Sequence, residues 1–227
     1  INDNMIYGRS VLSKFLDDRI LHEDEEVIVG FEGIFFNKVS KNSFDTIKKW
    51  YQKNGIDFIK DIKGQFCGFI YDKKINKLFI YNDHLSTKPL YFYHSKELFI
   101  FASELKVITK LLFKLNIKKE LDYDAVYCML TFGYMLDTIT YEKNTKKLSY
   151  ASILEIDNLF YIKIKKYFKY TKEKNFSFTK DDIIKKVDSM LINSVKNCWG
   201  KDDEYGYNHY SFLSGGLDSR VNLFLAK

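Results

Sequence analysis

Short apolar runs separated by polar segments fill the first two-thirds of the chain, and their lengths predict buried strands. Two of these runs, 65–71 and 77–81, flank the polar segment 72–76 and predict a β-hairpin. The other strands are expected over 26–31, 33–37, 90–93, 98–102, 152–156 and 160–166. This part of the chain is therefore expected to alternate strands with helices.

Apolar residues at helical spacing predict the helices between these strands. Ser43 is placed to cap a helix that ends near 54–55, where Asn and Gly follow the last apolar position. Ser103 is expected to cap a second helix over 105–112, and a third helix is expected over 122–131.

A polar stretch at 169–175 is the best candidate for a boundary, and it divides the chain into domains over 1–168 and 176–227. Along the second domain we expect a helix opened by Thr179 or Asp181, a loop at 202–204, a strand over 210–213, a turn over 214–219 and a helix from Val221 onward.

Composition limits the class of protein. The chain has 227 residues, 46% of them hydrophobic, which is enough apolar material for one or two folded domains. No window approaches 18 uninterrupted apolar residues, and the first residues lack the pattern of a secretory signal, so we expect no membrane span. The cysteines Cys67, Cys128 and Cys198 show no CxxC spacing and indicate reduced thiols in a cytoplasmic protein.

The formal charge of +6 does not indicate a nucleic-acid partner. Only three of the 36 basic residues are arginine, and the lysines are dispersed among 30 acidic residues. A nucleic-acid footprint usually concentrates basic residues and favours arginine, so a solvated lysine surface is expected instead.

The string Ser214-Gly215-Gly216-Leu217-Asp218-Ser219 carries the most chemistry, because it lies between an apolar run and the expected last helix. Two glycines allow a tight turn that exposes backbone N–H groups, and the helix N-terminus favours an anion. Two serine hydroxyls add donors, and Asp218 is a candidate ligand for Mg²⁺. The string predicts a phosphate-binding loop; the alternative is an ordinary strand–turn–helix connection.

This string resembles the pyrophosphate loop of the ATP pyrophosphatase superfamily, and the order of the chain resembles the asparagine synthetase family. The resemblance implies an α+β fold: an αββα sandwich of the N-terminal nucleophile hydrolase type, then the beginning of a doubly wound α/β domain. It also implies that Ser214, Gly215, Gly216, Asp218 and Ser219 bind the pyrophosphate of ATP, with Leu213 near the nucleotide. The segments 83–91, 101–106 and 63–69 are similar to further strings of the same family.

The resemblance fails at the glutamine pocket. The family needs an N-terminal cysteine as nucleophile, and residue 1 here is Ile1. Glu32 stands where the family has an amide donor for the oxyanion, and Gly33 is kept. Ile34 replaces a carboxylate, and Ser43 falls on or near the aspartate that binds the ammonium of glutamine. We therefore expect no catalytic residue in this pocket and no glutamine hydrolysis.

These observations predict an ATP-dependent amide-forming ligase that adenylates a carboxylate and then aminates it. The resemblance implies ATP, an amino-acid carboxylate and an amine or glutamine as small-molecule partners, with Mg²⁺ on Asp218. Because the family's further nucleotide contacts lie downstream of the loop, we expect ATP and Mg²⁺ to bind only with the rest of that domain or a completing chain, and a homodimer is possible. Two alternatives stay open: a non-catalytic scaffold or regulatory subunit, and an active glutaminase with a cysteine encoded before Ile1.

Overall fold

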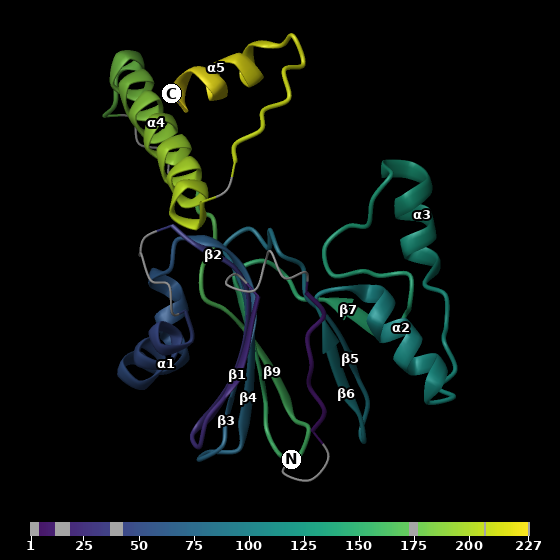
Figure 1. The fold of residues 1–227 in the computed structure, drawn as a ribbon. Coiled ribbons are helices and arrows are strands. Elements are labelled where there is room, and N and C mark those ends of the chain that lie inside the picture. Colours follow the sequence, from purple (N-terminus) through teal and green to yellow (C-terminus); the bar gives the residue numbers. More distant parts are fainter. Residues whose placement is uncertain (1–4, 12–18, 37–42, 173–176, 207, 227) are drawn as a thin grey trace. The chain divides into compact units, whose positions relative to one another are not determined.

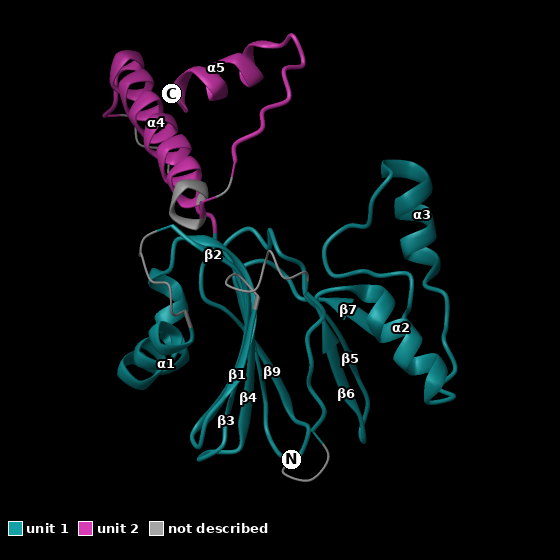
Figure 2. Ribbon diagram, in the orientation of Figure 1, with its two compact units in different colours: residues 1–169 teal, residues 170–227 magenta. Residues whose placement is uncertain are grey.

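The computed structural model describes residues 5–11, 19–36, 43–172, 177–206 and 208–226. The chain forms two compact units, Ile1–Lys169 and Tyr170–Lys227, which Figure 2 shows in separate colours. None of the helices in the described ranges is long and apolar enough to cross a membrane. The same ranges contain no group of three or more His, Cys, Asp or Glu side chains placed to hold a metal ion.

The first unit is built on a six-stranded antiparallel sheet with the strand order β1-β2-β3-β4-β8-β9 (Figure 1). Asp24 forms the turn between the first two strands, where its carboxylate accepts the backbone N–H groups of Glu26 and Val27. Asp72 does the same after β3 for Lys74 and Ile75. The strands are β1 Arg19–Glu23, β2 Val27–Phe35, β3 Gly64–Asp72, β4 Lys77–Asn82, β8 Ser152–Ile156 and β9 Ile162–Lys166.

A smaller antiparallel sheet has the order β6-β5-β7. Its strands are β5 Tyr91–His94, β6 Phe99–Ala102 and β7 Thr145–Lys147. The helices of this unit are α1 Ser43–Asn54, the 3-10 helix η2 Gly55–Asp61, α2 Leu105–Lys114 and α3 Tyr123–Phe132. Asp122 caps α3 by accepting two backbone N–H groups, and Gly133 ends it in a left-handed conformation with φ 76°.

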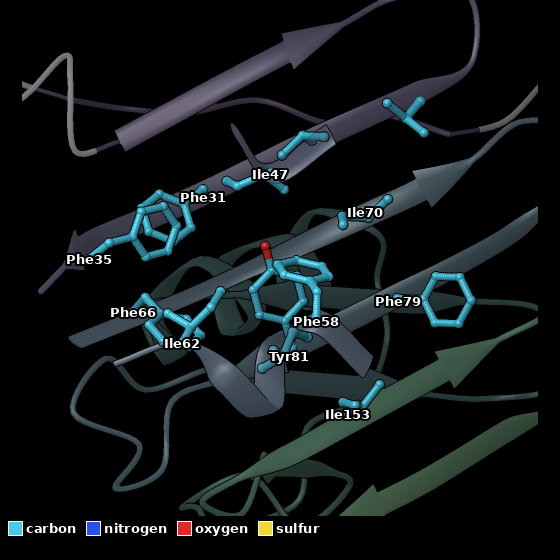
Figure 3. Close-up of a cluster of buried hydrophobic side chains, with 13 residues drawn as sticks. Phe31, Phe35, Ile47, Phe58, Ile62, Phe66, Ile70, Phe79, Tyr81 and Ile153 are labelled. Atoms are coloured by element: carbon cyan, nitrogen blue, oxygen red, sulfur yellow. The ribbon is translucent and has the colours of Figure 1, made fainter. Parts of the chain in front are cut away.

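The first buried cluster lies between the large sheet and the helices α1 and η2. Phe31, Phe66 and Tyr81 come from three neighbouring strands, and Ile47 and Phe58 come from the two helices (Figure 3). All five side chains are at most 4% exposed. Because alternate residues of a strand point to opposite faces, this cluster takes one face of the sheet and leaves the other for the second sheet.

The other face of the large sheet packs on the small sheet. Ile28, Cys67 and Leu154 of the large sheet share a cluster with Phe92 and Phe101 of the small one. A third cluster joins the outer side of the small sheet to α2 through residues such as Tyr93, Ile100 and Ile108. The order of layers is therefore helix, sheet, sheet, helix, and the predicted αββα sandwich is confirmed.

The second unit contains two described helices, α4 Lys180–Tyr205 and α5 Leu217–Leu225. Thr179 opens α4, because its hydroxyl accepts the backbone N–H of Asp182 while the Asp182 carboxylate accepts from Thr179. The helix continues through 202–204, so the loop predicted there is wrong. The last helix begins at Leu217 and not at Val221.

The strand predicted over 210–213 is also wrong: these residues form no strand and are exposed. A strand needs a neighbour to receive its backbone hydrogen bonds, and the described residues of this unit contain no other strand. The beginning of a doubly wound sheet consequently stays a prediction.

Four details of the first unit differ from the sequence prediction. Two strands were expected over 26–31 and 33–37, but Val27–Phe35 is one strand, β2, because its pairing with β3 continues past Gly30 and Gly33; residue 37 lies outside the described residues. Ser103 does not cap α2, whose N-cap is Glu104 without a side-chain hydrogen bond. Strand β9 begins at Ile162, two residues after the expected start. The elements β1, η2 and β7 were not predicted; β1 has only two apolar residues, Ile20 and Leu21, and β7 has only three residues.

Candidate functional site

Three of the four residues predicted for the degenerate glutamine pocket lie together on β2. Glu32 stands opposite Cys67 of β3, Gly33 opposite Phe66 and Ile34 opposite Gln65. Ser43 is the first residue of α1, and its side chain lies outside the described residues. The structure therefore places Glu32, Gly33 and Ile34 in one strand, and the predicted role of Ser43 stays a prediction.

Gly33 is required by the backbone at this point. Its φ of +137° is one that L side chains rarely adopt, and a Cβ would lie 2.0 Å from the carbonyl oxygen of Gln65. Gly64 shows the same crowding from β3, because its Cβ would lie 2.2 Å from the carbonyl oxygen of Ile34. The strands β2 and β3 thus approach closely next to Glu32, and this approach fixes the backbone on which Glu32 is presented.

Glu32 forms an ion pair with a lysine that is 56 positions later in the sequence. The Lys88 ammonium lies 3.5 Å from Oε1 of Glu32, and the side chains are 36% and 24% exposed. The position of Glu32 is the one at which the resemblance leads us to expect an amide donor. Sequence reasoning found Glu32 but missed its partner, because nothing local in the sequence connects the two residues.

The loop that carries Lys88 is organised by Asp83, which is 1% exposed. Its carboxylate accepts the backbone N–H groups of Phe66 at 3.0 Å, Leu85 at 2.8 Å and Thr87 at 3.1 Å. The hydroxyl of Thr87 donates to the same carboxylate at 2.5 Å. An Asp followed at two and four positions by N–H donors is a turn signal that could have identified this role.

Asn82 ties the same strand end to the rest of the unit and is fully buried. Its side-chain amide donates to the carbonyl oxygens of Leu148 at 3.2 Å and Ser149 at 2.9 Å, and its side-chain oxygen accepts the N–H of Ser152 at 3.0 Å. The hydroxyl of Tyr167 donates to the Asn82 backbone carbonyl at 2.8 Å. Sequence reasoning missed this residue, and the sequence gives no local signal for it.

Ser86, in the loop between Asp83 and Lys88, has a φ of +54°. The resembled family has Gly at this point of its segment, and glycine adopts this conformation without a steric cost. The Ser86 hydroxyl compensates in part by accepting a hydrogen bond from the Asn82 amide at 3.1 Å.

Of the cysteines, Cys67 lies next to the Glu32 position in the fold. Cys67 is 2% exposed within the cluster between the sheets, and Cys67, Cys128 and Cys198 form no disulfide. Cys67 lies on β3 opposite Glu32.

The predicted phosphate loop lies at the N-terminus of α5 in the second unit. Gly215 adopts a left-handed conformation with φ +80°, and Gly216 is the N-cap. The hydroxyls of Ser214 and Ser219 lie 3.3 Å apart, and the Ser219 hydroxyl donates to the Gly216 carbonyl at 3.2 Å. The structure thus brings Ser214, Gly216 and Ser219 together, while Leu213 precedes them with 62% of its surface exposed.

Asp218 lies in the first turn of α5 and is exposed. Within the described part of the chain its carboxylate has neither a hydrogen bond nor an ion pair, so it is available to a ligand. One carboxylate is a sparse ligand set, but Mg²⁺ is commonly held by one or two carboxylates together with substrate phosphates. The residues therefore fit Mg²⁺ bound with a polyphosphate.

Comparison with known proteins identifies a family to which the first unit is similar. The profile of a family described as the glutamine amidotransferase domain matches residues 32–168. A protein of Methanocaldococcus jannaschii provisionally named asparagine synthetase (glutamine-hydrolysing) 2 is 31% identical over 221 residues, which cover 89% of this chain and 42% of that protein. Asparagine synthetase (glutamine-hydrolysing) 2 of Bacillus subtilis is 27% identical over 88% of this chain and 29% of that protein. The chain therefore spans less than half the length of these curated relatives.

A solved structure described as the allosteric regulatory enzyme of purine biosynthesis is 10% identical, with a TM-score of 0.42 over 71% of this chain and 33% of that chain. A second, glutamine phosphoribosylpyrophosphate amidotransferase from Bacillus subtilis, has a TM-score of 0.33 at 12% identity, over 91% of this chain and 52% of that chain.

Proposed function

The chain belongs to the glutamine amidotransferase domain family, and on this premise we propose that it is part of an ATP-dependent ligase that forms an amide bond. The observation that carries the proposal is the loop 214–219, in which two glycines and two serine hydroxyls gather at the open N-terminus of α5. The names of the relatives, which are asparagine synthetases, support the same class of reaction.

In this proposal the loop binds the pyrophosphate part of ATP. Gly215 and Gly216 carry no side chain that would hold the phosphates away, and the first N–H groups of α5 are donors without helical partners. The hydroxyls of Ser214 and Ser219 add donors from both ends of the loop. Asp218 would hold Mg²⁺, whose charge neutralises phosphate oxygens when it is bound.

The reaction that such a loop serves is a two-step transfer. An oxygen of the acceptor carboxylate attacks the α-phosphorus of ATP, the bond from that phosphorus to the bridging oxygen breaks, and pyrophosphate leaves with the electron pair. The amine then attacks the activated carbonyl carbon, the carbon–oxygen bond to AMP breaks, and the amine loses a proton. The loop's part is to stabilise the charge that develops on the departing pyrophosphate.

We further propose that the pocket at Glu32 does not hydrolyse glutamine. A carboxylate at this position repels the oxyanion that develops on the carbonyl oxygen of the glutamine side-chain amide when its carbon is attacked, and loss of one oxyanion donor alone typically costs about 10²–10³ in rate. The ion pair with Lys88 bears on this proposal only by fixing a carboxylate, and not an amide donor, at this position. The amine would then be ammonia or another amine from solution.

The ligase proposal is tested by pyrophosphate release from ATP and Mg²⁺ over a panel of amino-acid carboxylates, each with ammonia as the amine. The gene product that contains this chain should release pyrophosphate with at least one of them. Ser214→Ala and Ser219→Ala should each lower kcat/KM about tenfold, whereas Ser189→Ala, which changes an exposed hydroxyl on α4, should leave it unchanged. Release with none of the carboxylates would contradict the proposal.

The second candidate function is a non-catalytic scaffold or regulatory subunit. It is favoured by the Glu32–Lys88 ion pair, which holds a carboxylate where the resembled family is expected to have an amide donor. This candidate would be supported if the wild-type gene product released no pyrophosphate and its loop variants released none either. An active glutaminase with a removed leader instead requires a cysteine encoded upstream of Ile1. Sequencing the codons upstream of Ile1 and assaying glutamate formation from glutamine distinguish this third possibility.

We propose a cytoplasmic location, because the three cysteines form no disulfide. The proposed partners are ATP, an amino-acid carboxylate and an amine, with a second copy or a completing chain supplying further nucleotide contacts. Gel filtration of the gene product with and without ATP tests the proposed assembly.

A further inference from the structure

Arg220 follows the phosphate loop directly and is the one arginine among residues 170–227. Of the 36 basic residues in the whole chain, 33 are lysine. The two side chains are not equivalent, because a guanidinium has five N–H donors in a planar fork that suits phosphate oxygens, whereas an ammonium acts as a compact point charge. An arginine at this position is therefore a feature that needs an explanation.

The side chain of Arg220 folds back from the first turn of α5 onto the loop. Its Nη2 donates to the carbonyl oxygen of Gly215 at 2.7 Å. A carbonyl oxygen that faced a bound anion would repel it, and this hydrogen bond engages the oxygen with a cation instead. The same bond keeps the guanidinium beside Ser214 and Gly216, which flank Gly215.

The rest of the guanidinium is available. Arg220 is exposed, and in the described ranges its side chain has no carboxylate within ion-pair distance and no hydrogen bond besides the one to Gly215. Asp218 is two positions earlier on the same helix, and residues at i and i+2 do not face each other. Four N–H donors and a full positive charge are thus left beside the loop.

The loop itself has no other cation. Residues 213–219 contain one charged side chain, that of Asp218, so without Arg220 the loop would present a net negative charge to a polyphosphate. Serine hydroxyls and backbone N–H groups donate hydrogen bonds but carry no full charge. Arg220 offsets Asp218 at the place where the phosphates would bind.

We infer that Arg220 binds the polyphosphate directly, using the N–H groups that the Gly215 carbonyl leaves unused. The inference rests on the proposed function, because it assigns a further residue to the same loop. Binding would keep the Gly215 contact and add one or two hydrogen bonds from the guanidinium to phosphate oxygens. The positive charge then serves both to attract the ligand and to hold it.

The test is calorimetric titration of the gene product with inorganic pyrophosphate and Mg²⁺. Arg220→Gln keeps a donor for the Gly215 carbonyl but loses the charge, and we expect it to bind about 10- to 100-fold more weakly. Arg220→Lys keeps the charge without the fork and should fall between Gln and wild type. Lys196→Gln removes the same charge from an exposed site on α4 and should bind as wild type does.

The dependence of pyrophosphate affinity on ionic strength is a second readout, and a purely structural role of Arg220 in the loop would not change it. Salt screens exposed charges, so wild-type affinity should fall more steeply between 0.05 and 0.5 M NaCl than that of Arg220→Gln. Equal losses in the Gln and Lys variants with an unchanged salt dependence would overturn the inference, and so would wild-type affinity in Arg220→Gln. If wild type itself binds no pyrophosphate, the loop proposal and this inference are both refuted.

Discussion

Replacing Asp83 with alanine should strongly destabilise the first unit. The Asp83 carboxylate is 1% exposed and accepts three backbone N–H groups and the hydroxyl of Thr87. Alanine would leave these donors without their acceptor, and the N–H of Phe66 among them is buried. The loop that positions Lys88 against Glu32 would lose its organising contact at the same time.

The magnitude follows from two opposing effects. A hydrogen bond to a charged group contributes about 1.5–3 kcal/mol net, and four such bonds converge on this carboxylate. Burying a charge costs several kcal/mol, which offsets a large part of the sum. We therefore expect Asp83→Ala to lower the free energy of unfolding by about 3–4 kcal/mol, near the upper end of single substitutions.

The assay can be made specific for the first unit. The chain has two tryptophans, and Trp50 packs against Phe35 and Phe58 in the first unit, whereas Trp199 is in the second. In a Trp199→Phe background, urea unfolding followed by fluorescence reports on Trp50 alone. The free energy of unfolding of Asp83→Ala is then compared with its background by linear extrapolation.

Asp157 provides the matched control. Its carboxylate accepts the backbone N–H groups of Leu159 at 2.9 Å and Tyr161 at 3.0 Å in an exposed turn. Water can replace the carboxylate there, so Asp157→Ala should cost no more than about 1 kcal/mol. A loss below about 1 kcal/mol for Asp83→Ala, or equal losses for the two variants, would refute the reasoning from buried hydrogen bonds.

Three further perturbations have defined outcomes in the same urea assay. Gly33→Ala should cost at least about 3 kcal/mol, because its Cβ would lie 2.0 Å from a backbone oxygen at φ +137°; Gly55→Ala, at φ +56° with open space around it, should cost about 1 kcal/mol, and equal costs would contradict the steric argument. Burial opposes ionisation of Asp24, but the Lys48 ammonium and two backbone N–H groups outweigh it and lower its pKa from 3.8 to about 2. Since the folded-state pKa lies below the unfolded one, the Asp24 contribution of about 1 kcal/mol should be complete above about pH 4 and be lost between pH 4 and 2. Asp24→Asn should flatten this part of the stability profile, and an unchanged profile would contradict the assignment. Tyr81→Phe should change stability by less than about 1 kcal/mol or raise it, because the buried Tyr81 hydroxyl has no hydrogen-bond partner within the described residues; a larger loss would reveal a partner.

The fold of the first unit could be predicted wherever local patterns and long-range pairing agree. The hairpin of β3 and β4 and the helix α1 lie close to their predicted positions, because alternation, turn residues and helical spacing are local signals. The sequence prediction divided β2 into two strands, because glycines such as Gly30 and Gly33 are read as strand ends when only the linear sequence is available. Their actual role is to let β3 approach closely, which only the pairing reveals.

The second unit shows the opposite case. The apolar run 210–213 predicts a strand by composition, yet those residues pair with nothing described and lie exposed. Strand formation depends on a neighbouring strand, so a local pattern cannot establish it. The capping of α4 by Thr179 was predictable, because both partners of the cap lie within four residues.

For the candidate sites, sequence identified Glu32 and the loop residues but not their surroundings. Lys88 and Glu32 meet because Asp83 fixes the conformation of the loop that carries Lys88. This arrangement depends on β3 and β4 being neighbouring strands. Arg220 was outside the string that carries the resemblance, and only the folded-back side chain shows its contact with Gly215.

A structure of the gene product that contains this chain, determined with ATP and Mg²⁺, tests the proposed nucleotide loop most directly. The proposal requires the β- and γ-phosphates within hydrogen-bonding distance of residues 214–219, with Mg²⁺ near Asp218. Phosphates bound at any other place, or a loop that stays empty at saturating nucleotide, would contradict it.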